Sequence, residues 1–202
     1  MSKKIAILGS GQGNVFKSIV DYFNNQDVQI MCLSNNLKSE ILKTAHELHI
    51  SNNYLPKEEN TQYFASNNFN LIVLTDYNET LDNDTLEVGQ FIDIHPSLLP
   101  AFKGNDAIQR AFLAGVKVTG VTVYQRKANI EEERILAQYP VLIGITTHID
   151  EVEKEIYEVE KKLYPPVIDA ILNDRVFDFQ DLLKNSCHKN GGCNGGCSQC
   201  NH

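Results

Sequence analysis

The strongest constraint on the fold is a set of short segments in which almost every residue is apolar. Residues 4–8, 28–33 and 71–74 each have the length of one strand. A strand that is apolar on both faces is typical of a parallel sheet buried between two layers of helices. Segments with the apolar spacing of helices lie between these strands, as over residues 15–23. The alternation of strand and helix therefore predicts an α/β fold with a mostly parallel sheet covered on both faces.

The second half of the chain carries a different pattern. Residues 119–125 and 134–142 are predicted to form two antiparallel strands. Residues 149–167 carry apolar side chains at steps of three and four, which predicts a long helix. Pro165 and Pro166 lie near its end, and because proline lacks the N–H group that a helix needs, we expect them to kink or end it.

The chain of 202 residues is long enough for one domain with a full hydrophobic core. The hydrophobic periodicity ends at Leu183, and the segment beyond it is rich in cysteine, glycine and asparagine. We therefore expect one folded domain over residues 1–183 and a cysteine-rich C-terminal extension over residues 184–202.

The net charge argues against two classes of partner, and the hydropathy indicates where the protein is located. The chain has 18 Lys and Arg residues against 26 Asp and Glu residues, and its formal net charge is −8. Nucleic acids and anionic membranes are bound by basic surfaces, so neither is an expected partner. No apolar run has the length of a membrane span, and the first residues lack the apolar core of a signal peptide. We therefore expect a cytoplasmic protein.

A short stretch that begins at Asp93 is the strongest candidate for a site of chemistry. It follows residues 91–92, which are expected to end a buried strand, and its two prolines predict a rigid loop. Loops at the carboxyl ends of parallel strands commonly carry the functional residues of α/β proteins. Asp93 and His95 share one side of an extended segment, where the carboxylate could orient and charge the imidazole. The alternative is that Asp93 caps a turn and His95 is a hydrogen-bonded loop residue with no part in chemistry.

A glycine-rich turn follows the first predicted strand and is a candidate anion site. It consists of Gly11, Gln12, Gly13 and Asn14 and leads directly into a predicted helix. Free N–H groups at a helix start can bind phosphate, and glycines let the backbone approach the anion. The turn lacks the Lys-Ser/Thr pair of a P-loop and the last glycine of a dinucleotide-binding motif. It is either a phosphate site or only a tight turn.

The extension holds four of the five cysteines, at positions Cys187, Cys193, Cys197 and Cys200. Their spacing, with glycines that allow tight turns, is compatible with one metal centre held by four thiolates. Zinc and an iron–sulfur cluster both accept such a set. In a reducing compartment, thiolate–metal bonds are expected rather than disulfides. The alternative is a reactive tail without metal, which has no hydrophobic core to order it.

Several segments of the chain match the pattern of a known family. The most specific is the block His95-Pro-Ser-Leu-Leu-Pro-Ala-Phe-Lys-Gly104. Further matching segments are Ser10-Gly-Gln-Gly13, Leu33-Ser-Asn35, Gly115-Val-Lys-Val-Thr-Gly-Val-Thr-Val123, Ala137-Gln138 and Tyr164-Pro165. Together these segments resemble the phosphoribosylglycinamide formyltransferases of purine synthesis. The resemblance extends over most of residues 4–180. It implies a Rossmann-like, mostly parallel sheet with helices on both faces.

The resemblance also implies an activity, the transfer of a formyl group from the co-substrate 10-formyltetrahydrofolate to a primary amine. The amine would belong to a phosphorylated small molecule, first of all glycinamide ribonucleotide. By position, His95 would polarise the formyl oxygen. Asp93 stands where the family has an Asn, and Glu131 stands where it has an Asp that pairs with the His. Residues 11–14 would bind the phosphate of the acceptor, and Glu160 would bind its ribose.

The chain departs from the family pattern near the expected chemistry. Besides Asp93 and Glu131, Tyr124 stands where the family has a His. Thr75-Asp-Tyr-Asn-Glu79 stands where the folate-side loop of the family is Ala-Gly-Phe-Met-Arg. Three functions are compatible with these departures. They are a working formyltransferase, an inactive relative that binds a phosphorylated ligand and has a regulatory or redox-sensing tail, and other carbonyl chemistry with Asp93 and His95 as an acid–base pair.

Overall fold

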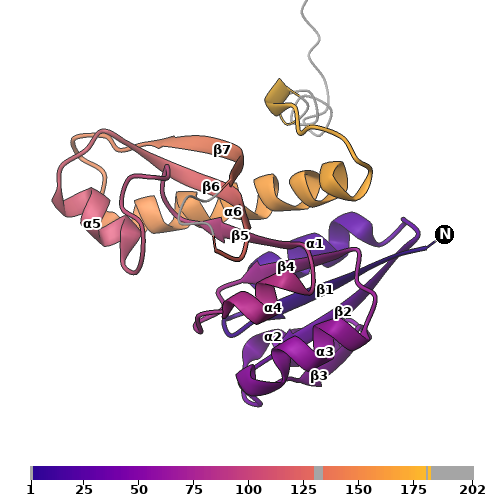
Figure 1. Ribbon diagram of the computed structural model, residues 1–202. Helices are drawn as coiled ribbons and strands as arrows, with labels where there is room; N and C mark the ends of the chain where they lie inside the picture. The colour runs from indigo at the N-terminus through magenta and orange to yellow at the C-terminus, as the bar shows by residue number, and fades with distance from the viewer. Residues whose placement is uncertain (1, 130–133, 181, 183–202) are drawn as a thin grey trace, which may run out of the picture.

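The computed structural model describes residues 2–129, 134–180 and 182, which form one sheet with helices on both faces (Figure 1). The strands are β1 (Lys3–Gly9), β2 (Val28–Ser34), β3 (Ser51–Tyr54), β4 (Leu71–Thr75), β5 (Phe91–His95), β6 (Val118–Arg126) and β7 (Arg134–Leu142). The helices are α1 (Asn14–Phe23), α2 (Glu40–Glu47), η1 (Lys57–Glu59), α3 (Asn60–Ser66), α4 (Asn83–Glu87), α5 (Ala107–Leu113) and α6 (Ile149–Leu172). The strand order is β3-β2-β1-β4-β5-β6-β7. Strands β1 to β5 pair in parallel, whereas β6 pairs antiparallel with both β5 and β7.

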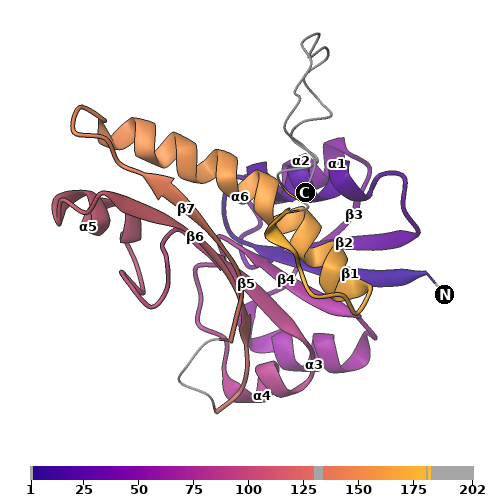
Figure 2. The same ribbon diagram turned by 90° about the horizontal axis from the view of Figure 1, so that it is seen from above.

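Two layers of helices bury the sheet, as Figure 2 shows from above. Helices α1, α2 and α6 cover one face, and α3 and α4 cover the other. Strand β1 contributes to both cores, because Ile5 and Ile7 belong to the first and Ala6 and Leu8 to the second. All four side chains are fully buried. The expected Rossmann-like, mostly parallel sheet with two covered faces is therefore confirmed.

Strand β5 extends further than the sequence predicted. The loop expected to begin at Asp93 begins after His95 instead. The strand continues because β6 pairs with it over its whole length, with Asp93 opposite Tyr124 and His95 opposite Thr122. Pro96 follows, and proline cannot donate to the ladder. The positions of Asp93 and His95 are thus set by a sheet rather than by a loop.

Helix α6 runs to Leu172 with Pro165 and Pro166 inside it. Of the two effects expected of these prolines, to kink the helix or to end it, the second is therefore wrong. Proline in a helix interior costs about 3 kcal/mol because a backbone hydrogen bond is lost. Leu163 and Ile168, on either side of the prolines, are fully buried. Each large apolar side chain buried in this way contributes about 1.5–3 kcal/mol, which offsets that loss.

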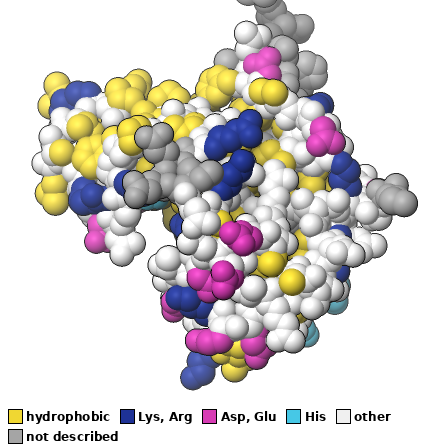
Figure 3. All heavy atoms as spheres, viewed as in Figure 1, with side chains coloured by type: hydrophobic (Ala, Val, Ile, Leu, Met, Phe, Trp, Pro, Cys, Tyr) yellow, Lys and Arg dark blue, Asp and Glu magenta, His cyan; other side chains and the backbone are white. Residues whose placement is uncertain are grey.

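One end of the molecule carries exposed apolar side chains. Leu113 in α5, Leu142 at the end of β7 and Ile145 just beyond it are largely exposed. Figure 3 shows apolar side chains gathered over this end of the molecule. No helix within the described ranges is both long and apolar enough to cross a membrane.

Candidate active site

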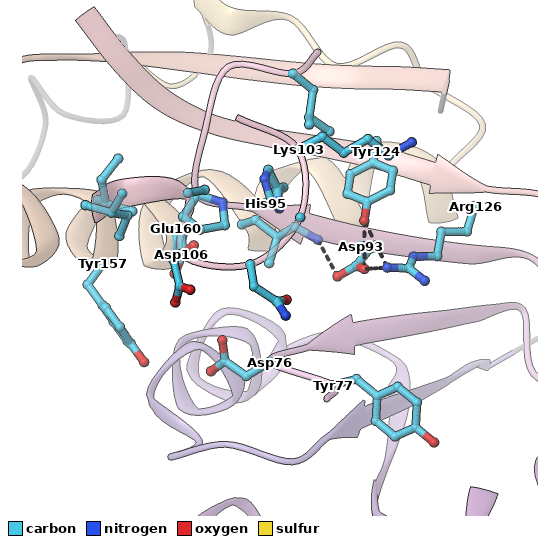
Figure 4. A pocket seen from close by; sticks show the side chains of 18 residues that line it. Asp76, Tyr77, Asp93, His95, Lys103, Asp106, Tyr124, Arg126, Tyr157 and Glu160 are labelled. Carbon is cyan, nitrogen blue, oxygen red and sulfur yellow. Dashed lines mark hydrogen bonds and ion pairs between the residues drawn. The ribbon is translucent and has the colours of Figure 1, made fainter. Parts of the chain in front are cut away.

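A cleft of about 390 Å³ opens at the carboxyl ends of β4 and β5 (Figure 4). Its lining includes Asp76 and Tyr77 after β4, Asp93 and His95 from β5, Lys103 and Asp106 from the following loop, Tyr124 and Arg126 from β6, and Tyr157 and Glu160 from α6. The cleft lies where the parallel part of the sheet meets the antiparallel part. Charged groups from several elements therefore face one space, which is the usual place for a ligand site in an α/β fold.

His95 lies at the end of β5 and lines the cleft. Its Nε2 atom is 3.1 Å from the carbonyl oxygen of Phe102. Because a carbonyl oxygen only accepts, Nε2 carries the hydrogen in this contact. Arg110 donates to the same oxygen at 2.7 Å and to the carbonyl oxygen of Lys103 at 2.8 Å. These bonds orient the imidazole and leave Nδ1 as the ring nitrogen that can bind a ligand.

The loop after His95 is fastened to the antiparallel strands. The hydroxyl of Thr122 donates to the carbonyl oxygen of Ser97 at 2.6 Å and accepts from the N–H of Leu99 at 3.0 Å. Gln138 Nε2 donates to the carbonyl oxygen of Leu99 at 2.9 Å. The block of residues that the sequence singled out is therefore a fixed turn beside the cleft, held from β6 and β7.

Asp93 is held by three groups. Arg126 Nη2 lies 2.9 Å from its Oδ2 atom, and the Tyr124 hydroxyl donates to the same oxygen at 2.9 Å. The N–H of Ile94 donates to Oδ1 at 2.8 Å. Burial raises the pKa of the Asp93 carboxyl group, and Arg126 and Tyr124 oppose that shift. No hydrogen bond joins Asp93 to His95 in the described structure, although the charge of His95 also acts on the Asp93 carboxyl group.

Two further carboxyl groups, Asp76 and Glu160, face the cleft. Glu160 is only 6% exposed, and its burial, together with the charges of Asp76 and Asp93, raises its pKa to about 8. Burial also raises the pKa of Asp76, and Asp93 adds to the shift. The pKa of Tyr157 is raised to about 12 by burial and by the charges of Asp76 and Glu160. At neutral pH Glu160 is therefore mostly protonated and can donate as well as accept a hydrogen bond.

The glycine-rich turn lies beside the cleft rather than in its lining. Gly13 precedes α1 and has a φ of 80°, in the left-handed region that favours glycine. No described side chain caps the start of α1, so its first N–H groups can face an anion. Gly11 contacts Asp76, because a Cβ atom on Gly11 would lie 2.8 Å from Asp76 Oδ2. Of the predicted acceptor-binding residues, Glu160 alone lines the cleft, whereas residues 11–14 do not.

Some predicted site residues lie outside the described part of the chain. They are Glu131 and the four cysteines of the extension, Cys187, Cys193, Cys197 and Cys200. Their roles stay predictions. Among the residues that the structure does describe, no three His, Cys, Asp or Glu side chains are grouped so that they could hold a metal ion.

Four charged residues of the cleft, Arg126, Asp76, Lys103 and Asp106, were not identified as site residues from the sequence. Arg126 lies one residue beyond the predicted strand, but residues two apart on a strand share a face, so its alternation with Tyr124 could have revealed it. Asp76 stands where the resembling family has a glycine. Its φ of 49° is left-handed, which Asp tolerates better than most residues. The replacement of the family's glycine by Asp76 was the signal in the sequence that this position differs.

Comparison with known proteins agrees with the geometry. A model of the formyl transferase family matches residues 3–168. The chain is 32% identical over 185 residues to the phosphoribosylglycinamide formyltransferase of Bacillus subtilis, with 84% of this chain and 95% of that protein covered. It is 34% identical over 181 residues to the Haemophilus influenzae protein of the same name, with 82% and 85% covered.

A solved structure shares the fold. Glycinamide ribonucleotide transformylase 1 from Geobacillus kaustophilus superposes with a TM-score of 0.79 at 28% identity, over 85% of this chain and 100% of that one. The residues matched by the family model, 3–168, include all strands from β1 to β7. From the family model, the relatives and the shared fold, it follows that the chain belongs to the phosphoribosylglycinamide formyltransferase family.

Proposed function

We propose that the protein transfers the formyl group of 10-formyltetrahydrofolate to the primary amine of glycinamide ribonucleotide, a step of purine biosynthesis. Family membership supports the reaction class. The observation that carries the proposal is the position of His95, at the carboxyl end of β5 and in the lining of the cleft. A cytoplasmic location, expected from the sequence, suits this role and is part of the proposal.

The reaction needs one new bond and one broken bond. The amine nitrogen of the acceptor attacks the formyl carbon, and the formyl oxygen gains negative charge. When this intermediate collapses, the bond from the formyl carbon to the folate nitrogen breaks, and the proton lost by the amine balances the proton gained by that nitrogen. Stabilising the developing oxyanion is commonly the largest contribution to catalysis of such a step.

His95 is the group proposed to stabilise that oxyanion. Nε2 of His95 is bonded to the Phe102 carbonyl oxygen, which leaves Nδ1 for the formyl oxygen. When the ring carries a proton on Nδ1, that N–H can donate to the oxyanion. Glu131 is proposed to pair with His95 and to help move the proton. Asp93 is proposed to stand in for the family's Asn at this site, with Arg126 and Tyr124 holding its carboxylate in place.

The acceptor is proposed to bind across the cleft and the adjoining turn. Its ribose hydroxyls would bond Glu160, which is buried and can donate and accept. Its phosphate would lie at residues 11–14, where the uncapped start of α1 offers N–H groups.

The test is a formyl-transfer assay with 10-formyltetrahydrofolate and glycinamide ribonucleotide. The wild-type protein is expected to turn over. The substitution His95→Gln is expected to lower kcat by about 10²–10⁴-fold, the usual effect of removing a positioned acid–base group. His46→Gln, an exposed histidine in α2, is the matched control and is expected to keep full activity. Equal activity of the His95 and His46 variants would contradict the proposal.

A second candidate function is supported by the contacts of Asp93. Its carboxylate is already bound by Arg126, Tyr124 and the backbone, so it offers no free donor to an oxyanion. An inactive relative that binds a phosphorylated ligand, with a metal-binding regulatory or redox-sensing tail, would have this arrangement. Ligand binding by a wild-type protein that does not turn over would favour it.

A further inference from the structure

Arg126 carries hydrogen-bond donors that no described group uses. Within the described residues, both bonds of its guanidinium group come from Nη2, to Asp93 Oδ2 at 2.9 Å and to the Tyr124 hydroxyl at 3.2 Å. Its Nε atom is buried and has no acceptor among those residues. A buried N–H without an acceptor is destabilising unless a ligand supplies one. The side chain lines the cleft and is 31% exposed, so a ligand in the cleft can reach it.

The guanidinium group of Arg126 is held in one orientation. Asp93, which accepts from it, is only 13% exposed and also accepts from the N–H of Ile94 at 2.8 Å. The guanidinium carbon lies 5.8 Å from the centre of the Tyr124 ring. Because the group is planar and held through Nη2, the directions of its other N–H groups are fixed as well. Such a group can select ligands by the position of an acceptor atom.

One end of the cleft is assigned to the acceptor in the proposed function, at Glu160 and the adjoining turn of residues 11–14. Figure 4 shows Glu160 and Arg126 on opposite sides of His95 and Asp93. The formyl donor has to bring its formyl carbon to His95 without overlapping the acceptor. The side of Arg126 is therefore the end of the cleft left for the donor.

The spacing along β5 fits a folate at this end. Asp93 lies two residues before His95, about 7 Å along a strand, and Arg126 is bonded to Asp93. The ring carbonyl oxygen of a reduced folate is separated by a comparable length from the nitrogen that carries the formyl group. This oxygen and the ring nitrogen beside it form the same face as in guanine, which arginine binds with two N–H groups.

We infer that Arg126 is a specificity-determining residue for the formyl donor, and that its guanidinium group donates to the ring carbonyl oxygen of the folate. The inference rests on the proposed function, because it takes the donor to be 10-formyltetrahydrofolate. Asp93 and Tyr124 then act as positioning residues that hold the guanidinium group beside this oxygen. A guanidinium group only donates, so a folate with an amino group in place of the carbonyl oxygen would set a donor against a donor.

The test compares two folates that differ at this one position. Folic acid carries the ring carbonyl oxygen, and aminopterin carries an amino group there. Binding of each to the full-length protein is measured by calorimetry. The wild-type protein is expected to bind folic acid about tenfold more tightly than aminopterin, within the usual range for arginine on such a face. In Arg126→Gln the preference is expected to fall below about twofold, because an amide group can turn to present either a donor or an acceptor.

Arg134→Gln is the matched control. Arg134 is an exposed residue of β7 that does not line the cleft, and the substitution makes the same chemical change. It is expected to leave both affinities unchanged. A double variant, Asp93→Asn with Arg126→Gln, removes both charges and so leaves no unpaired ion at the site. It is expected to lose the preference to the same extent, and it replaces the single variant if that variant does not fold.

Equal binding of the two folates by the wild-type protein, or binding of neither, would overturn the inference. A preference that persists in Arg126→Gln would also overturn it. This includes the case in which both affinities fall by the same factor, since Arg126 would then only support the structure of the site.

The formyl-transfer assay gives a second readout. Arg126→Gln is expected to raise KM for 10-formyltetrahydrofolate about tenfold and to change KM for glycinamide ribonucleotide by less than about twofold. An equal rise in both KM values would contradict the inference.

The same assay separates this inference from the proposed function. A preference for folic acid that depends on Arg126, in a protein that does not transfer formyl groups, would reject the proposed function and keep the role of Arg126. Formyl transfer by a protein whose preference does not depend on Arg126 would reject that role and keep the function.

Discussion

Asp93 brings a negative charge to a position where the family has a neutral Asn, and neighbouring changes balance it. Arg126 supplies the opposite charge at 2.9 Å, and Tyr124, which replaces a His of the family, donates to the same oxygen. The guanidinium also donates to the Tyr124 hydroxyl at 3.2 Å. The three residues form one network whose members depend on each other. A substitution at one of them is therefore expected to affect the other two.

We expect Asp93→Asn to lower the free energy of unfolding by about 2 kcal/mol, since Arg126 is left without its carboxylate. A fully buried pair would lose about 3–5 kcal/mol, but the side chains of Asp93 and Arg126 are 13% and 31% exposed. Urea unfolding measures the change. Arg126→Gln is expected to have a similar effect, and the double variant is expected to lose less than the sum. Strictly additive losses would show that the two residues act independently.

The raised pKa of Glu160 predicts that the stability of the folded protein depends on pH. Its pKa is raised from 4.5 to about 8 in the folded protein, so between these values the folded state binds more protons than the unfolded state. Stability from this group is full below about pH 4.5 and is lost as pH rises through 8. Glu160→Gln is expected to flatten the decline in stability between pH 5 and pH 8, by a few kcal/mol in unfolding experiments. An unchanged slope would refute the raised pKa.

At the scale of elements, helix α6 is joined to the two neighbouring strands β4 and β5 beside the cleft. The hydroxyl of Tyr164 donates to the carbonyl oxygens of Leu74 in β4 at 2.9 Å and Ile92 in β5 at 3.1 Å. Both strands lead into the cleft, and Glu160 lies one turn earlier on the same helix. The helix thus fixes the positions of the strand ends as well as that of Glu160.

Tyr164→Phe removes only the hydroxyl and leaves two buried carbonyl oxygens without this partner. The free energy of unfolding is expected to fall by about 1–3 kcal/mol. Tyr22→Phe, which removes an exposed hydroxyl from α1, is the control and should change stability by less than about 0.5 kcal/mol. Thermal and urea unfolding of the two variants give the comparison. Equal stabilities would mean that the Tyr164 bonds contribute nothing net.

The sequence predicted the strands in which almost every residue is buried and apolar. Strands β1, β2 and β4 were found because they are apolar on both faces. Strand β3 was missed because its four residues are all exposed at the sheet edge, and only its pairing with β2 defines it. Helix α4 was missed because it is only five residues long. Its start is marked by Asp82, which accepts from the N–H of Thr85 at 2.8 Å.

The residues of the candidate site also fall into two groups, those that the sequence could identify and those that it could not. Asp93 and His95 could be named because they follow a buried strand at a spacing of two, and Glu160 because it stands in a segment that resembles the family. Arg126 and Asp76 depend on which strands are neighbours and on the left-handed backbone at the end of β4. The sequence held one signal for each, the alternation of Arg126 with Tyr124 and the departure of Asp76 from the family's glycine, but only the structure shows that both residues line the same cleft.

At the scale of the whole molecule, the sheet and both cores are formed by residues of the described ranges 2–129, 134–180 and 182. Family membership gives no reason why formyl transfer would need the cysteines beyond them. A metal centre there is therefore predicted to serve regulation, redox sensing or a partner contact.

The full-length protein, purified without oxygen, is expected to contain about one zinc ion or one iron–sulfur cluster per chain. Elemental analysis and absorption spectra measure this. Removal of residues 187–202 is expected to abolish metal binding and to leave the unfolding temperature of the folded domain unchanged. Metal-free full-length protein would reject the prediction, and metal retained by the truncated protein would place the centre elsewhere.

The two bonds of Tyr164 also bear on which acceptors can fit. Because the Tyr164 side chain is bonded to both β4 and β5, moving helix α6 away from the cleft to admit a larger molecule would break both bonds. Extra volume would have to come from the opposite wall, the turn of residues 96–106. Variation in that turn, rather than in the helix, is where discrimination by size is expected to arise.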